Sequence, residues 1–526
     1  MFRFVELDGV MRVVRHRSNT SEDPLNRRQL LGATAALPLL TVLRRGAAAA
    51  PGAVPFDAAL VRQLARDAAS KPFKAPDNKL PDSLKDLDYD RYRALRFNPE
   101  KALWRGENLP FEVQFFHRGS FYTNRVDIYE VADGQATQVP YKPENFSFAT
   151  TPPPAAGSDL GFGGFRLHAP INRPDYYDEV CVFLGASYFR AVAKGQVYGL
   201  SSRGLSINTG EAAGEEFPAF RVFWIEKPAT NASSIVIHAL LDSESAAAAY
   251  RFTIRPGETT VFDVEMVIFP RVELKTAGLA AITSMFFFGP NDRKQVEDFR
   301  PAVHDSDGLA IFNGRGEQLW RPLHNPRDLQ ISSFGDRSPR GFGLMQRQKE
   351  FSDYQDLESS FERRPSLWVE PIGDWGEGSV QLLEIPTNEE IHDNIGSFWR
   401  PKNVLPAKGE QAFTYRLHWG PDQPKPSALA IFSRSGVGSR GDDTKLFVLD
   451  LIGDKLKSVD PTKIKGVVTA EKAEIRNIVT QRNPQTGGWR LSFEMAAKVK
   501  TPVELRAILM QEDQPVSEVW VYRWTP

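Results

Sequence analysis

The length, composition and charge of the chain exclude several classes of protein. Its 526 residues exceed what one hydrophobic core usually organises, so two domains are expected. With 41% hydrophobic and 25% charged residues, the composition is that of a globular protein and not of a disordered one. The 65 Lys and Arg residues balance 66 Asp and Glu residues and do not gather into a basic patch that would bind phosphates. Nucleic acid is therefore not expected as the main partner.

The first 50 residues have the pattern of an export signal. Arg27 and Arg28 precede a short apolar run at 30–43, and alanines fill 47–50. Together these features predict a cleaved signal, because a basic start and small residues flank an apolar run that is too short for an ordinary membrane anchor. The arginine pair indicates the twin-arginine route. We therefore expect a periplasmic protein with no stable membrane insertion after residues 1–50 are removed. An ordinary N-terminal helix is the alternative.

The rest of the chain is expected to be all-β. Residues 56–70 have the apolar spacing of a helix, whereas most later segments alternate apolar and polar residues between turns rich in Gly and Pro. The polar stretch 400–410 carries two prolines and is predicted to be a linker. It would separate a large catalytic β-sandwich at 51–399 from an immunoglobulin-like sandwich at 411–526. The single cysteine, Cys181, lies in an apolar run and is expected in the core.

Two short motifs carry the residues most suited to chemistry. AVHDSDG at 302–308 and IHDNIG at 391–396 each place a His-Asp pair ahead of a glycine. Because neighbouring side chains on a strand point to opposite faces, and because no HExxH or CxxC pattern is present, we expect no metal site. The chain has no GxSxG motif, and the glycines at 159–165 lack the strand and helix of a phosphate loop. Neither a serine nucleophile nor a cofactor is therefore expected.

A pair of carboxylates is the remaining candidate for catalysis. A glycosidase needs one carboxylic acid to protonate the leaving oxygen and one carboxylate to activate the acceptor. Asp305 and Asp393 fit these roles, although by themselves both are more simply explained as turn-forming residues. A saccharide cleft also needs aromatic rings beside planar polar groups, a mixture that core aromatics next to solvated charges produce as well. Segments with this mixture contain Tyr188, Arg190, Arg203, Trp224, Trp368 and Glu370.

An ordered series of segments extends across nearly all of the chain after the signal. It includes LWRGENLPFEVQFFHRG, SDLGFGGFRLHAP, YGLSSRGL, EEFPAFRVFW, ITSMFFFGPNDR, GFGLMQR, RRPSLWVEP and DNIGSFW. Together these segments resemble the family of periplasmic glucan biosynthesis proteins OpgG and OpgD, also called MdoG and MdoD. The arginine pair is more similar to the OpgD branch.

The resemblance implies a fold, a reaction and residue roles. It implies a large N-terminal sandwich similar to the mutarotase fold, an immunoglobulin-like C-terminal domain and a homodimer. It also implies a part in making osmoregulated periplasmic glucans, by inverting action inside linear β-1,2-glucan. Asp393 matches the general acid of the family, and Asp305 matches the general base, which is thought to reach the attacking hydroxyl through intervening groups. Phe361 and Glu390 join the candidate substrate contacts.

The chain departs from the hydrolytic members of that family at two places. They carry a tyrosine where Phe361 stands, and the stretch 433–450 is shorter than their corresponding loop, so the path that delivers water is in doubt. A hydroxyl of the bound glucan would then be the acceptor. We therefore favour an inverting transglycosylase, able to close the chain through an α bond, over an inverting endo-β-1,2-glucanase. A non-catalytic glucan-binding partner of the membrane glucan synthase is the third hypothesis.

Overall fold

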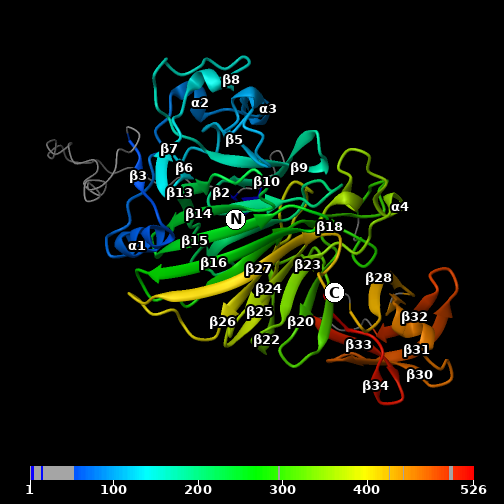
Figure 1. Cartoon of the computed structure of the whole chain (residues 1–526). Coiled ribbons are helices and arrows are strands. Elements are labelled where there is room, and N and C mark those ends of the chain that lie inside the picture. Colours follow the sequence, from blue (N-terminus) through cyan, green and yellow to red (C-terminus); the bar gives the residue numbers. More distant parts are fainter. Residues whose placement is uncertain are drawn as a thin grey trace, which may run out of the picture.

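The computed structural model is built almost entirely of strands (Figure 1). It describes residues 2–4, 13–15, 52–293, 296–425, 427–441, 443–496 and 501–526. The predicted export signal lies outside these residues, apart from the short strands β1 (Phe2–Phe4) and β2 (Val13–Arg15). Within the described residues, no helix is both long and apolar enough to cross a membrane.

One half of the main sandwich is an antiparallel sheet, here called sheet 1. Its strands lie side by side in the order β22 (Gln330–Arg337), β25 (Glu377–Glu384), β26 (Ile395–Pro401), β17 (Ala277–Ser284), β12 (Ser201–Ile207), β11 (Tyr188–Ala191), β10 (Tyr176–Leu184), β9 (Gly164–Arg173) and β5 (Glu112–Phe116). Non-consecutive strands are neighbours, so segments far apart in the sequence meet in this sheet.

The other half is a longer sheet, here called sheet 2. Its strands follow the order β3 (Val54–Pro55), β7 (Gln135–Gln138), β6 (Asp127–Ala132), β13 (Ala219–Glu226), β14 (Ile235–Asp242), β15 (Ala246–Arg255), β16 (Thr260–Pro270), β27 (Gln411–Gly420), β24 (Ser366–Ile372), β23 (Gly341–Met345), β20 (Gly308–Phe312), β21 (Gln318–Pro322), β35 (Val519–Trp524), β33 (Val503–Gln511) and β30 (Ile464–Ala470). The short strand β34 (Gln514–Pro515) pairs with β33.

Sheets 1 and 2 pack face to face through aromatic side chains. Phe183 of sheet 1 stacks on Phe165 with ring centroids 5.0 Å apart, and it meets the edges of Phe223 and Phe252 of sheet 2 at 5.4 and 5.3 Å. These rings are fully buried, because the strands alternate an apolar face toward the core with a more polar outer face. The structure thus confirms the all-β sandwich predicted from the sequence.

The C-terminal part of the chain forms a second, smaller sandwich. One layer, here called sheet 3, contains β28 (Ile431–Ser439), β29 (Thr444–Ile452), β32 (Gly488–Ala496) and β31 (Ile475–Asn483). Trp520 of β35 contacts Phe447 and Phe493 of sheet 3, with centroids 6.0 and 6.2 Å apart. The other layer is therefore the end of sheet 2, which continues across the junction because β21 and β35 pair in parallel through Leu319 and Val519.

The predicted linker at 400–410 does not mark the boundary between the two sandwiches. Strand β27 begins at Gln411, where the second domain was expected to start, yet it pairs with β16 and β24 inside sheet 2. The hydrogen bonds of the main sandwich therefore continue to Gly420, and the first strand of sheet 3 begins at Ile431. Proline content marks a turn but cannot reveal that the strand after it returns to the first sheet.

The predicted N-terminal helix is present as α1 (Ala58–Ala69). Asp57 caps it, since its side chain accepts a hydrogen bond from the Leu60 N–H at 2.9 Å. Its apolar side packs on β14, β15 and β16, on the face of sheet 2 opposite sheet 1. The other short elements are α2 (Asp82–Lys85), α3 (Tyr89–Arg93), α4 (Phe351–Tyr354), four 3₁₀ turns (Pro99–Lys101, Pro143–Asn145, Phe361–Arg363, Asp454–Ser458) and the strand pairs β4 (Arg96–Phe97) with β8 (Phe146–Ser147) and β18 (Phe286–Phe288) with β19 (Val303–His304).

The aromatic packing between sheets 1 and 2 predicts a large effect of Phe183→Ala. Losing a fully buried ring at the centre of the core should lower the free energy of unfolding by about 3–5 kcal/mol, measured by denaturant unfolding. Tyr176→Ala in the same strand is the control, because this side chain is 60% exposed and its loss should change stability by less than about 0.5 kcal/mol. Equal effects of the two substitutions would contradict this description of the core.

Candidate active site

Asp305, the proposed base, directly follows β19. Its backbone N–H donates a hydrogen bond to the carbonyl oxygen of Met285 at 2.9 Å. The side chain is 1% exposed and forms an ion pair with Arg364, which is itself mostly buried. A guanidinium held against a carboxylate away from water favours the ionised form of that carboxylate. That form is the one able to accept a proton.

Asp393, the proposed acid, precedes β26 and is also 1% exposed. The side chain of the next residue, Asn394, fixes the backbone of this turn. Its Oδ1 accepts from the N–H of Phe286 at 2.8 Å, and its Nδ2 donates to the carbonyl oxygens of Phe286 and Ile385 at 2.9 and 3.0 Å. The turn is thereby tied to β18 on one side and to the end of β25 on the other.

The two aspartates share one support, the stretch 284–286 that leads from β17 into β18. Asp305 is bound to the middle residue of this stretch, and Asn394 to its last residue. Ser306, beside Asp305, is joined to its first residue through two hydroxyl oxygens 2.8 Å apart. Two segments that are far apart in the sequence, one with Asp305 and the other with Asp393, therefore bind the same stretch of backbone.

Polar and aromatic side chains connect Asp393 to open space. Tyr188 of β11 and Arg203 of β12 are cross-strand partners, and the guanidinium carbon of Arg203 lies 5.2 Å from the ring centroid of Tyr188 and 5.0 Å from that of Phe217. Glu215 accepts a hydrogen bond from Arg203 at 2.5 Å. Burial raises the pKa of Tyr188; Arg203 opposes this, and the charges of Glu215 and Asp393 add to it. Asp393 therefore lies close enough to act on this cluster.

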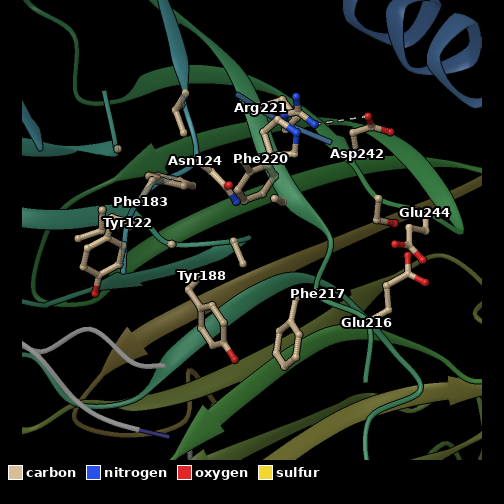
Figure 2. A pocket seen from close by; sticks show the side chains of 18 of the residues that line it. Tyr122, Asn124, Phe183, Tyr188, Glu216, Phe217, Phe220, Arg221, Asp242 and Glu244 are labelled. Carbon is tan, nitrogen blue, oxygen red and sulfur yellow. Dashed lines mark ion pairs between the residues drawn. The ribbon is translucent and has the colours of Figure 1, made fainter. Parts of the chain in front are cut away.

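The same cluster forms part of the wall of a cleft of about 700 Å³. Tyr188, Glu215 and Phe217 line it together with residues of β13 and of the loops at 121–126 and 208–217. Figure 2 shows Tyr188 and Phe217 side by side and the ion pair of Arg221 with Asp242 farther along the cleft. The two aspartates are buried and are not among the residues that line this cleft.

Three other predicted contacts lie near these residues. Arg190 is buried in β11, on the same face of the strand as Tyr188. Phe361 is buried, with its ring centroid 4.3 Å from the guanidinium carbon of Arg364, the partner of the proposed base. Glu390 is partly exposed in the loop that leads into the IHDNIG motif. All three remain candidates for binding or positioning a substrate.

The remaining predicted contacts lie elsewhere. Trp224 stacks on Phe56 with centroids 6.0 Å apart and belongs to the apolar cluster beneath α1, on the face of sheet 2 that points away from sheet 1. Trp368 and Glu370 line a separate cavity of about 400 Å³ at the junction with the C-terminal sandwich. Alternation along a strand shows that two residues share a face, but it does not show which layer covers that face.

The ionisable residues of the AVHDSDG motif face different partners. His304 Nδ1 is 2.9 Å from the side-chain oxygen of Gln346, Asp305 pairs with its arginine, and Asp307 accepts a hydrogen bond from the Arg347 N–H at 3.1 Å. The three side chains therefore do not converge. Among the described residues, no group of three His, Cys, Asp or Glu side chains is arranged to hold a metal ion.

Burial shifts two pKa values of this motif in opposite directions. It raises the pKa of Asp307 to about 7, with Arg347 opposing the shift, and lowers the pKa of His304 to about 4, with Gln346 opposing the shift. Between about pH 4 and 7, folded Asp307 keeps a proton that the unfolded chain releases, so its contribution to stability is lost as pH rises. His304 acts in the opposite sense below about pH 6.5, because only the unfolded chain takes up its proton.

Asp307→Asn is expected to remove one of these opposing effects. The difference between the free energy of unfolding of the variant and that of the unsubstituted protein should increase by up to about 1.4 kcal/mol for each pH unit as the pH rises from about 4 to 7. Denaturant unfolding at the two ends of this range measures the difference. Identical pH profiles for the two proteins would show that the pKa of Asp307 is not raised.

Two residues of the site were not singled out by the sequence. In the sequence, the segment RRPSLWVEP was selected for Trp368, yet Arg364 of the same segment is the residue that pairs with Asp305. Asn394 follows the proposed acid, and its amide binds both the N–H and the C=O of one residue on a neighbouring strand. Charge and position in a motif were the available signals, but the partner of each residue comes from a distant part of the chain.

Comparisons with known proteins give a consistent result. The chain is 68% identical to a protein named Glucans biosynthesis protein G from Bradyrhizobium diazoefficiens, over 95% of this chain and 100% of that one. Proteins of the same name from Rhodopseudomonas palustris (strain BisA53) and Vibrio cholerae are 67% and 50% identical, over 95% and 89% of this chain and 100% and 87% of theirs. Their name is that of the G branch, whereas the predicted twin-arginine signal suggests the D branch. The family described as periplasmic glucan biosynthesis protein, MdoG, matches residues 56–524. The chain belongs to this family of periplasmic glucan biosynthesis proteins.

Proposed function

We propose that the protein remodels linear β-1,2-glucan by an inverting transfer, with Asp393 as general acid and Asp305 as general base. The observation that supports the proposal is that residues 284–286 bind both Asp305 and Asn394, the residue next to the buried Asp393. Inverting glycoside chemistry requires two carboxyl groups with different surroundings. Asp305 pairs with Arg364, whereas the charge of Asp393 helps to raise the pKa of Tyr188, whose burial is the main cause of that shift.

The proposed step moves two protons and exchanges one bond for another. Asp393 gives its proton to the glycosidic oxygen, and the fragment on the reducing side leaves with a new hydroxyl group. The acceptor hydroxyl attacks the anomeric carbon from the opposite face, and its proton passes to Asp305, directly or through intervening groups. One β bond is broken and one α bond is formed. A return of the proton from Asp305 to Asp393 through the surrounding groups restores both residues.

The surroundings of Phe361 support transfer over hydrolysis. Its ring lies against the guanidinium of Arg364 and 5.7 Å from the ring centroid of Tyr354, so carbon fills the space next to the partner of the base. A phenylalanine ring has no hydroxyl that could pass a proton from water. A sugar hydroxyl is then the favoured acceptor, and a hydroxyl on the same chain would close a ring.

The wall of the cleft supports a saccharide as the substrate. Sugars place their C–H faces on aromatic rings and their hydroxyls on planar charged groups. Arg203 offers this combination, since its guanidinium lies between the rings of Tyr188 and Phe217. Its Nε and Nη2 are buried and have no hydrogen-bond partner among the described residues. Two fixed donors next to the proposed acid suit the hydroxyls of a bound glucan.

Replacing the proposed acid tests whether the protein is an enzyme. Asp393→Asn should slow the conversion of linear β-1,2-glucan by about 100-fold or more, because the amide cannot protonate the leaving oxygen. Chromatography of the glucan over time measures the rate, and an unchanged thermal unfolding curve serves as the control for folding. Undiminished conversion by the variant would rule out Asp393 as the acid. Glucan binding without conversion by either protein would favour a non-catalytic glucan-binding protein.

Counting reducing ends separates transfer from hydrolysis. Hydrolysis creates one new reducing end for each bond broken, whereas transfer within one chain creates none. With the unsubstituted protein, the number of reducing ends should stay constant while the linear glucan is consumed and products without a reducing end accumulate. A rise of one reducing end for each bond cleaved would show that the protein is a glucanase.

Phe361→Tyr should move the reaction toward hydrolysis. The added hydroxyl would provide a group able to pass a proton between water and the region of Asp305, so new reducing ends should form at least about threefold faster relative to total bond cleavage. Phe361→Leu is the matched control, because it changes the packing without adding a hydroxyl. An equal product ratio for the two variants would remove Phe361 from the explanation of acceptor choice.

A further inference from the structure

The residues at the end of β23 connect the segment that carries Asp305 with the C-terminal sandwich. Gln346 is 1% exposed and holds His304 at two points: its Oε1 is 2.9 Å from the ring Nδ1, and its Nε2 donates to the His304 carbonyl oxygen at 2.9 Å. The same Nε2 reaches the carbonyl oxygen of Phe361 at 3.3 Å. The residue before Asp305 is therefore fixed by one buried amide.

Arg347 continues this connection on the other side of Asp305. Its backbone N–H donates to Asp307 at 3.1 Å, and the N–H of Asp307 donates to the carbonyl oxygen of Met345 at 2.9 Å. The segment 304–307 is thus attached to the segment 345–347 before and after the proposed base. Because these attachments are buried or partly buried hydrogen bonds, moving one segment requires moving the other or breaking these bonds.

Among the described residues, the guanidinium of Arg347 binds groups of the C-terminal sandwich and the tryptophan at its border. It donates to Glu518 at 2.5 and 3.0 Å and to the carbonyl oxygen of Phe432 at 2.8 Å. Its carbon lies 3.5 Å from the ring centroid of Trp320. Glu518 is 3% exposed and also accepts the Phe432 N–H at 2.8 Å. This ion pair therefore joins β28, which contains Phe432, and the residue before β35 to the backbone next to Asp305.

We propose that the C-terminal sandwich positions Asp305, with Arg347 and Glu518 as positioning residues for the reaction. The inference rests on the proposed function, since Asp305 must be the base for its position to matter. A base that acts at a distance depends strongly on the position of its carboxylate, and a misplacement of about 1 Å can cost about 100-fold in rate. The C-terminal sandwich then contributes to turnover without touching the glucan.

Glu518→Gln is the direct test. The amide keeps the acceptor for the Phe432 N–H but removes the charge that holds Arg347. We expect kcat for linear β-1,2-glucan to fall about tenfold to 100-fold, while KM and the Kd for glucan change less than about twofold. The kcat of Arg347→Lys should lie between that of the unsubstituted protein and that of Arg347→Met, because lysine keeps the charge but cannot donate two parallel hydrogen bonds to Glu518. If Arg347 and Glu518 had purely structural roles, these substitutions would lower the folded fraction and leave kcat per folded molecule unchanged.

An ion pair inside sheet 3, between a buried aspartate and a partly exposed arginine, provides the control. Asp450 is 6% exposed and accepts two hydrogen bonds from Arg490, each at 2.8 Å, with no bond to the segment 304–307. Asp450→Asn should lower thermal stability like Glu518→Gln and leave kcat unchanged. An equal fall in kcat for both, or an unchanged kcat for folded Glu518→Gln, would overturn the inference. Full activity of Asp305→Asn would instead overturn the proposed function, so the two failures are distinguishable.

Discussion

The hydrogen bonds made by residues 284–286, where β17 ends, are the constraint on which the site depends. Backbone groups that emerge from a sheet into the interior must find partners, and here they bind Asp305 on one side and the side chain of Asn394 on the other. Two turns that each carry an aspartate are thereby held against the same three residues. The chemistry proposed for the pair requires this closeness, and the sheet supplies it through strands that are not neighbours in sequence.

Burying charged groups beside that support imposes further partners. An ionised carboxylate away from water needs a cation or several donors, and Asp305 has Arg364. Arg203 packs against two rings and pairs with Glu215, and two of its donor atoms are buried without a hydrogen-bond partner among the described residues. A buried cation with open donors is expensive in a structural core, whereas at a saccharide site the ligand or its water completes the bonding. The energetics therefore favour a binding role for Arg203 over a purely structural one.

The fold class predicted from the sequence is confirmed, the roles of the two aspartates stay predictions, and the limits of sequence reasoning are physical. Alternation of apolar and polar residues is a local property, so the strands and α1 could be predicted. Pairing partners are not local, which is why the return of β27 to sheet 2 was missed. The same limit applies to Trp224, whose ring stacks on Phe56, just before α1, and on Tyr129 of β6, and does not line the cleft. Arg364 lies in a segment that was noticed, but its partner could be identified only once both segments were placed.

The continuity of sheet 2 across the junction changes how the C-terminal sandwich should be regarded. A domain joined by a flexible linker would transmit little force to the site, but β21 and β35 share backbone hydrogen bonds, and the stacked Arg347 lies directly beside them against Trp320. The buried pair of Arg347 with Glu518 would be costly to break, because either charge left alone would remain in a place shielded from water. The segment that carries Asp305 is therefore connected to β28 and to Glu518 of the smaller sandwich through Arg347, which is the basis for the proposed positioning role.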